Sequence, residues 1–298
     1  MAGVKQSRKA MQASSSFNFV VVLESLPENE MKTGKQIYDD QLMHINAQYP
    51  ILKSELVQVD TSGEFVDALR QLTDQVNEQN LIPLLHIECH GSKHGLKMAD
   101  GSMLPWARLK NELIPLNRAT QLNLTVVVGA CNGGHLIGTA SHMDGAPFFG
   151  VIGVDGEITS GDLERRFKSF YRTLFETAGD ANAALGSLNQ AASDPSQKFI
   201  FLGARRFFAE SFRKYYWNYC RGKQKRKRTE ALVSRVLQDP KVARLGIKFA
   251  RNQIKKHLSD PKDDFEFFRN RFFFCDQIPG ILERLPLEYE KVINGSYA

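Results

Sequence analysis

Cysteine, proline and tryptophan are all scarce in this chain of 298 residues, with 4, 11 and 2 copies. Four cysteines without tight spacing do not form a disulfide framework, so we expect free thiols in a reducing compartment. No apolar run reaches the roughly 18 residues that a membrane-spanning helix needs. The polar and basic first residues lack an apolar block, which predicts no secretory signal and a cytoplasmic location.

Negative charge is scarce in the last third of the chain. Residues 201–298 hold 22 Lys and Arg against 11 Asp and Glu, whereas residues 1–200 hold 17 against 22. A dense part of this positive charge lies in the run over residues 223–228. The asymmetry indicates two functional parts. We therefore predict a flexible tail (1–15), an α/β domain (16–218) and a basic helical C-terminal region (219–298).

Short, nearly wholly apolar segments are abundant, and they alternate with helical patterns. We predict strands over 17–23, 52–59, 82–88, 122–128, 148–154 and 199–203. We predict a hairpin over 95–103, a short helix after Gly134, and helices over 29–47, 63–77, 107–117, 160–177, 180–192 and within 229–298. This alternation predicts an α/β sandwich with a mainly parallel sheet, whose active site lies beyond the carboxyl ends of the strands.

Two of the predicted strands lead into residues that can carry out chemistry. One leads into Cys89, His90 and Gly91, and the other leads into Gly129, Ala130 and Cys131. If these strands are parallel neighbours, His90 and Cys131 meet at one edge of the sheet. An imidazole beside a thiol can take its proton, which makes the sulfur a nucleophile. The backbone N–H groups of Gly91 and Cys131 would then hold a developing oxyanion.

At these residues the chain resembles the caspase-like (clan CD) cysteine peptidases, and within them the bacterial CHAT-type branch. The similarity rests on Leu-Leu-His-Ile-Glu-Cys-His-Gly (84–91) and Val-Val-Val-Gly-Ala-Cys (126–131), and it covers roughly residues 17–210. The order of hairpin, helix and strand between the two motifs is also similar, as is the helix that contains residues 170–174.

The resemblance implies a caspase-like three-layer sandwich for residues 16–218 and an endopeptidase with His90 and Cys131 as its catalytic dyad. It implies that neither a metal nor a cofactor takes part. It also implies a protein or peptide substrate, such as a gasdermin-like pore former in a bacterial antiviral defence or cell-death pathway.

The nucleophile motif departs from the caspase signature Gln-Ala-Cys-Arg/Gln/Gly-Gly. Gly129 stands where Gln is expected, and Asn132 occupies the variable position. Because those surroundings help caspases to recognise an aspartate, aspartate specificity does not carry over. Glu24, Asp155 and Glu157, near the ends of the first and fifth strands, would instead bind a basic substrate side chain. An apolar pocket is the alternative.

Two other patterns near the dyad have competing interpretations. The histidines at 86, 90 and 94, together with Cys89, suggest a zinc site, but a strand would keep His86 and His90 well apart on one face. We therefore expect no metal site. Residues 129–134 have the glycine spacing of a phosphate-binding loop but lack the Lys-Ser/Thr that follows it, so we reject that function.

Two further functions stay open as alternatives to the peptidase. The chain would be a catalytically silent caspase-like scaffold if its helical C-terminal region only binds a partner protein, or a metal-dependent hydrolase if the histidines bind a metal ion. We interpret the basic run over residues 223–228 as a solvated helix or linker, and the alternative is contact with an acidic partner surface or nucleic acid. The C-terminal region is a candidate contact for a regulatory partner, whereas nucleic acid is not an expected ligand.

Overall fold

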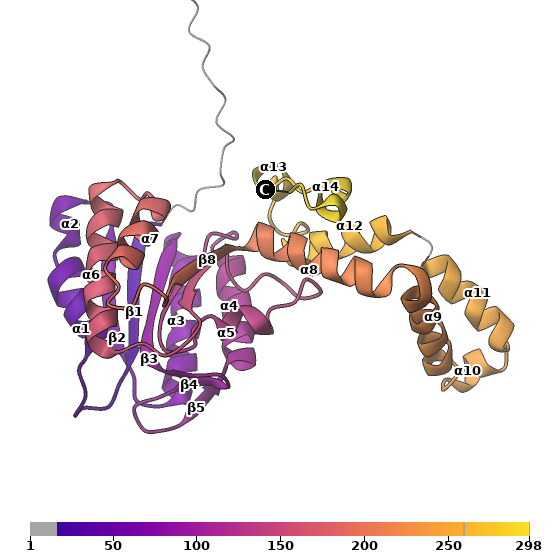
Figure 1. Cartoon of the computed structure of the whole chain (residues 1–298), viewed down its shortest axis with the longest axis horizontal. Helices are drawn as coiled ribbons and strands as arrows, with labels where there is room; N and C mark the ends of the chain where they lie inside the picture. Colours follow the sequence, from indigo (N-terminus) through magenta and orange to yellow (C-terminus); the bar gives the residue numbers. More distant parts are fainter. Residues whose placement is uncertain (1–16, 259, 298) are drawn as a thin grey trace, which may run out of the picture.

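A mixed sheet of eight strands forms the core of the α/β part in the computed structural model, which describes residues 17–258 and 260–297 (Figure 1). Six strands follow the order β2-β1-β3-β6-β7-β8, all parallel except β8, which runs antiparallel to β7. They are β1 (Phe19–Ser25), β2 (Lys53–Gln58), β3 (Pro83–Ser92), β6 (Thr125–Gly129), β7 (Gly150–Val154) and β8 (Phe199–Gly203). The remaining two, β4 (Gly95–Lys97) and β5 (Met103–Pro105), form the predicted hairpin against the end of β3.

Helices cover both faces of this sheet. Those of the α/β part are α1 (Thr33–Ile37), the π-helix η1 (Tyr38–Leu42), α2 (Ile45–Gln48), α3 (Ser62–Gln79), α4 (Trp106–Ala119), α5 (His135–Thr139), α6 (Ser160–Glu176) and α7 (Ala181–Gln190). Helices α3 and α4 bury side chains such as Phe65 and Leu113 on one face, against Val21 of β1. Helices α1, α6 and α7 pack on the other face, where Phe167 lies in one cluster with Val127 of β6.

This arrangement confirms the predicted α/β fold with a mainly parallel sheet, and it is consistent with a caspase-like three-layer sandwich. Polar and apolar residues do not alternate along β1, β6 and β7, because both faces of the sheet are buried. Each residue of these strands contacts one helical layer or the other. The predicted tail over residues 1–15 lies outside the described residues.

Two element boundaries differ from the sequence-based prediction in ways that affect the site. The helix predicted over 29–47 begins only at Thr33, since a turn at Pro27, closed by the Glu30 N–H to the Pro27 carbonyl at 3.1 Å, keeps residues 26–32 in a loop. Strand β3 does not stop at Glu88 but continues to Ser92, because its last residues pair with β4. His90 is therefore held inside a strand.

The C-terminal helices are α8 (Ala204–Tyr219), α9 (Gly222–Val236), α10 (Pro240–Ala243), α11 (Ile247–His257), α12 (Pro261–Phe272), α13 (Ile281–Arg284) and α14 (Tyr289–Asn294). Helices α12–α14 fold back along α8, and together they bury an aromatic cluster that also contains Phe149 of the α/β part. Helices α9, α10 and α11 project from the far end of α8, and we call residues 221–257 the arm (Figure 1). Within the described ranges, no helix is both long and apolar enough to cross a membrane.

Candidate active site

A pocket of about 180 Å³ lies at the carboxyl edge of the sheet and brings His90 and Cys131 together in its lining. Its walls come from the loop after β1, the ends of β3 and β6, and the segment from β7 into α6. The lining consists of Leu26, Glu30, Met31, Thr33, Glu88, Cys89, His90, Gly129, Cys131, Ile158, Ser160 and Leu163. In the sheet, β2 lies on one side of β1 and β3 lies on the other. The strand order therefore reverses beside β1, next to this pocket, and ligand sites are common at such positions.

His90 lies within β3, and Cys131 lies two residues after the end of the neighbouring strand β6. Glu88 of β3 pairs in register with Gly129 of β6, and both functional residues follow two positions later. Residues two apart on a strand share a face, and adjacent strands lie about 4.8 Å apart. The backbones touch here, since a Cβ on Gly91 would come within 1.9 Å of the Cys131 carbonyl oxygen. Only glycine at position 91 allows this approach.

The Cys131 thiol is held by the segment that enters α6. The Ile158 N–H lies 3.3 Å from Sγ, and the thiol in turn lies 3.5 Å from the Ile158 carbonyl oxygen. Directly after the cysteine the chain turns sharply, because Asn132 adopts a left-handed conformation with φ of 56° and its N–H binds the Gly156 carbonyl. Asparagine tolerates this conformation better than most residues. The sulfur thus sits on a fixed turn at the pocket wall.

His90 has an acidic partner that sequence analysis missed. Its Nε2 lies 2.7 Å from a carboxylate oxygen of Glu30, and the two side chains are 46% and 41% exposed. A carboxylate on one ring nitrogen fixes the orientation of the ring and leaves the other nitrogen for a proton from elsewhere. Glu30 lies 60 positions earlier in the chain, within a segment predicted to be helical, so no local pattern pointed to it.

A buried polar chain runs beneath the pocket. The Tyr171 hydroxyl lies 2.8 Å from His86 Nδ1, His86 Nε2 lies 2.8 Å from one oxygen of Glu88, and Thr33 donates to the other oxygen at 2.7 Å. Burial raises the pKa of Tyr171 well above its ordinary value, and the charge of Glu88 raises it further, so the phenol keeps its proton. Tyr171, His86, Glu88 and Thr33 thus form one continuous buried network.

This buried polar network leaves no room for a side chain at position 129. A Cβ at that position would come within 2.2 Å of Glu88 Oε1 and 3.0 Å of His86 Nε2. The Glu88 carboxylate therefore occupies the space that a larger side chain at position 129 would need. The signal for this role was present in the sequence, since Glu88 lies two residues before His90 on the same strand face.

The three residues predicted to bind the substrate side chain lie outside the pocket lining. Glu24 is 1% exposed and its carboxylate accepts from the Lys35 N–H at 3.1 Å and from Gln58 at 2.7 Å. Asp155 is 82% exposed and pairs with His135 at 3.7 Å, and Glu157 is also exposed. The structure therefore brings His90, Gly91 and Cys131 together but does not add these acids to them.

The other cysteines are in different surroundings. Burial raises the pKa of Cys89 well above its ordinary value, with a further contribution from the charge of Glu88. Burial also raises the pKa of Cys220 and Cys275, which lie in the C-terminal part. A thiol with a raised pKa is a poor nucleophile at neutral pH. In the described part of the chain, no group of three or more His, Cys, Asp or Glu side chains has an arrangement that could hold a metal ion.

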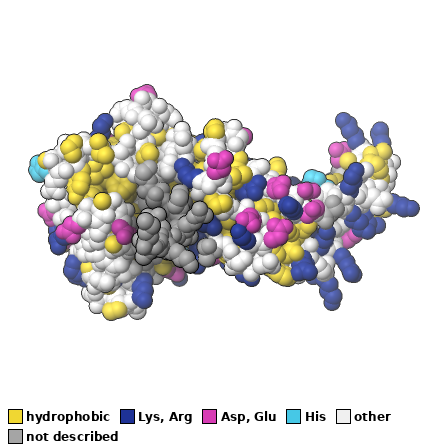
Figure 2. Space-filling view, turned by 90° about the horizontal axis from the view of Figure 1, so that it is seen from above, with side chains coloured by type: hydrophobic (Ala, Val, Ile, Leu, Met, Phe, Trp, Pro, Cys, Tyr) yellow, Lys and Arg dark blue, Asp and Glu magenta, His cyan; other side chains and the backbone are white. Residues whose placement is uncertain are grey.

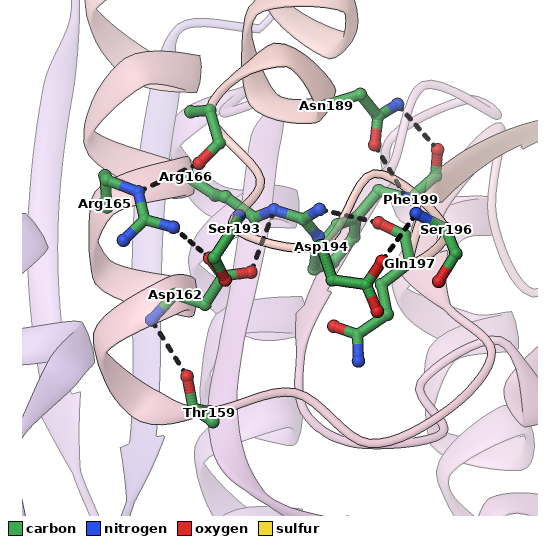
Figure 3. A network of polar contacts seen from close by, with 11 residues as sticks. Thr159, Asp162, Arg165, Arg166, Asn189, Ser193, Asp194, Ser196, Gln197 and Phe199 are labelled. Carbon is green, nitrogen blue, oxygen red and sulfur yellow. Dashed lines mark hydrogen bonds and ion pairs between the residues drawn. The ribbon is translucent and has the colours of Figure 1, made fainter.

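A second polar network fixes the start of α6, which carries the pocket residues Ser160 and Leu163 (Figure 3). Asp162 lies 3.1 Å from the guanidinium of Arg166, which is fully buried and donates to the Gln197 carbonyl at 2.6 Å. Ser193 donates to Asp162 from its backbone N–H and from its hydroxyl at 3.0 and 2.7 Å. Burial alone would raise the pKa of Asp162, but these hydrogen bonds and the neighbouring arginines outweigh it and lower the pKa. The helix start is thus tied to the loop before β8.

A comparison with protein-family models finds no match to this chain, and a comparison with curated proteins finds none either.

Proposed function

We propose that this chain is a cysteine endopeptidase in which Cys131 is the nucleophile and His90 transfers protons. The observation that carries the proposal is the shared pocket, which is lined by both side chains at the carboxyl edge of the sheet. Each has a partner that fixes it, Ile158 for the sulfur and Glu30 for the imidazole. A nucleophile, a base and a group that orients the base are the parts that covalent acyl transfer needs.

The reaction would proceed in two stages. Cys131 gives its proton to His90, and the sulfur forms a bond to the carbonyl carbon while the C=O electron pair moves onto oxygen. When the pair returns, the C–N bond breaks and His90 protonates the leaving amine. Water then gives a proton to His90 and attacks the thioester, and the C–S bond breaks to regenerate the thiol. The N–H groups of Gly91 and Cys131 are the proposed donors to the oxyanion.

The direct test compares single substitutions with matched controls elsewhere in the chain. Cys131→Ala and His90→Ala should each abolish cleavage of a diverse peptide library read by mass spectrometry. Cys275→Ala and His94→Ala, which remove the same residue types outside the pocket, should leave cleavage intact. Cleavage that survives in Cys131→Ala would refute the proposed nucleophile. Selective alkylation of Cys131 by iodoacetamide is the expected companion result, since a silent scaffold would show no such preference.

We further propose that the arm binds a regulatory protein with an acidic surface. Residues 221–257 hold 13 Lys and Arg against 2 Asp and Glu, and Figure 2 shows basic side chains spread over the far end of the molecule. Leu245, Ile247 and Phe249 are 58%, 51% and 43% exposed in the same segment. Because phosphate contacts do not need exposed apolar side chains, this mixture favours a protein surface over nucleic acid.

A binding assay can separate these partners. A fluorescent polyglutamate peptide should bind the full chain at 0.15 M salt, and Lys223→Glu with Lys227→Glu should weaken it. Tighter binding of a DNA duplex than of the peptide would contradict a protein partner.

The cytoplasmic location is a proposal supported by the polar N-terminal sequence, whereas the bacterial defence setting and a gasdermin-like substrate are proposals supported by the resemblance alone. Cleavage of a co-expressed pore former that depends on Cys131 would test the last of these.

A further inference from the structure

We infer that the pocket beside Cys131 accepts a positively charged substrate side chain, lysine or arginine, and that Glu88 is the carboxylate that pairs with it. This inference rests on the proposed peptidase function, since it names the substrate class of the same site. It assigns the specificity to a residue other than the three acids expected from the sequence.

The charge of the pocket lining is the first argument. Its ionisable side chains are the carboxylates of Glu30 and Glu88, the imidazole of His90 and two thiols, and it contains neither lysine nor arginine. Lys32 lies next to the lining residues Met31 and Thr33, but its ammonium group donates to the Leu26 carbonyl. Glu30 is already paired with His90. The carboxylate of Glu88 is therefore left without a cationic partner among the lining residues.

The hydrogen-bonding state of Glu88 is the second argument. Its two oxygens accept one bond each, from His86 and from Thr33, whereas a carboxylate has about four acceptor positions. His86 and Thr33 therefore leave about two acceptor positions of Glu88 open to a further donor. Glu88 is only 1% exposed, so water does little to screen it. A substrate ammonium or guanidinium group would find a fixed acceptor there.

The shape of the pocket is the third argument. Gly129, Glu88 and Cys131 all line the pocket, and because Gly129 has no side chain the Glu88 carboxylate can lie against its backbone, 2.2 Å from the position that a Cβ would take. Leu26, Met31 and Leu163 supply apolar surface around the pocket. Lysine and arginine carry a methylene stem that packs on such surface while the charged end reaches a polar group. An aspartate or glutamate side chain would instead meet a negative charge.

A peptide library digested with the full-length protein tests the inference. Wild-type cleavage should follow Lys or Arg, and Glu88→Gln should lower kcat/KM for those substrates by about 10- to 100-fold, the value of a hydrogen bond between charged groups. Glu24→Gln is the matched control, because Glu24 is equally buried and pairs in register with Glu88 but lies outside the pocket lining. It should retain the Lys/Arg preference. Cleavage after acidic or apolar residues, or an unchanged preference in Glu88→Gln, would overturn the inference.

A second measurement decides the matter even if no peptide is cut or Glu88→Gln fails to fold. Wild-type Cys131 is alkylated with neutral iodoacetamide in the presence of either n-butylammonium or n-butyrate at equal concentrations. The cation should protect the thiol and the anion should not. Equal protection by both ions, or protection by butyrate alone, would show that the pocket does not select positive charge. Absence of cleavage together with protection by the cation would refute the peptidase and leave the charge preference standing.

Discussion

Replacing Gly129 by alanine adds a single methyl group at the most crowded point of the candidate site. The new Cβ would lie 2.2 Å from Glu88 Oε1, 2.6 Å from its carboxyl carbon and 3.0 Å from His86 Nε2. Gly129 does not adopt a positive φ, so the backbone accepts alanine and the effect is purely steric. The carboxylate must move by about an ångström to restore an ordinary contact, which would stretch its bonds to His86 and Thr33 at 2.8 and 2.7 Å.

The expected cost follows from these contacts. Overpacking a buried site costs about 1–3 kcal/mol. A hydrogen bond to a charged group is worth about 1.5–3 kcal/mol, and weakening it loses a fraction of that free energy. We therefore expect a free energy of unfolding lower by about 2–4 kcal/mol, measured by urea denaturation. Fluorescence of Trp106, which is 2% exposed, should follow the transition. Gly186→Ala is the control, since it lies within α7 with open space around its Cβ and should gain about 0.5–1 kcal/mol.

The result that would refute the reasoning is a Gly129→Ala protein as stable as wild type to within about 0.5 kcal/mol, the usual range of a neutral surface substitution. The Glu88 carboxylate would then not fill the space beside Gly129. The explanation for glycine at position 129, and the inferred pairing of Glu88 with a substrate side chain in the pocket, would both have to be abandoned.

Three other predictions follow from the contacts described above. Glu30→Gln should lower kcat roughly tenfold with little change in KM, because it weakens the positioning of His90 and not substrate binding, and Glu30→Asp should recover part of the loss. Asp162→Ala should lower the free energy of unfolding by about 3–5 kcal/mol, because it leaves the fully buried Arg166 without its partner. An effect below about 1 kcal/mol would contradict a structural role for the pair. Burial lowers the pKa of His142 to about 4, so the unfolded chain takes up its proton first as pH falls. Stability should therefore be full above about pH 6.5 and drop by about 1–3 kcal/mol between there and pH 4, and His142→Phe should remove that part of the pH dependence in urea titrations.

The sequence was sufficient to predict the fold class and the two strand ends that carry the candidate dyad. Segments such as residues 20–23 and 126–128 are wholly apolar because they are buried on both faces, and this local property is visible without tertiary structure. Alternation of strands and helices then limits the topology to a few arrangements. The parallel β3–β6 pair, whose register ends at Glu88 and Gly129 two residues before His90 and Cys131, is one of them.

Apart from the position of Glu88 on the same strand face as His90, the composition of the site beyond the dyad was not predictable in the same way. Glu30 meets His90 because a turn at Pro27 delays the start of α1, and Glu88 faces the pocket instead of solvent because Thr33 and Gly34 pack over it. The acids near the strand ends were plausible from their position alone, but Glu24 points to Gln58 and Asp155 points to His135.

In the C-terminal region, too, some features were predictable from the sequence and others depended on the tertiary structure. Its basic, helical character was visible in the sequence, but the separation into the arm and the helices α12–α14, which return to α8, was not. Local sequence determines which side chains a segment must bury and which charges it carries, since both depend on residue type and period. Which carboxylate meets which histidine depends on contacts between segments far apart in the chain, and only the packed tertiary structure decides those.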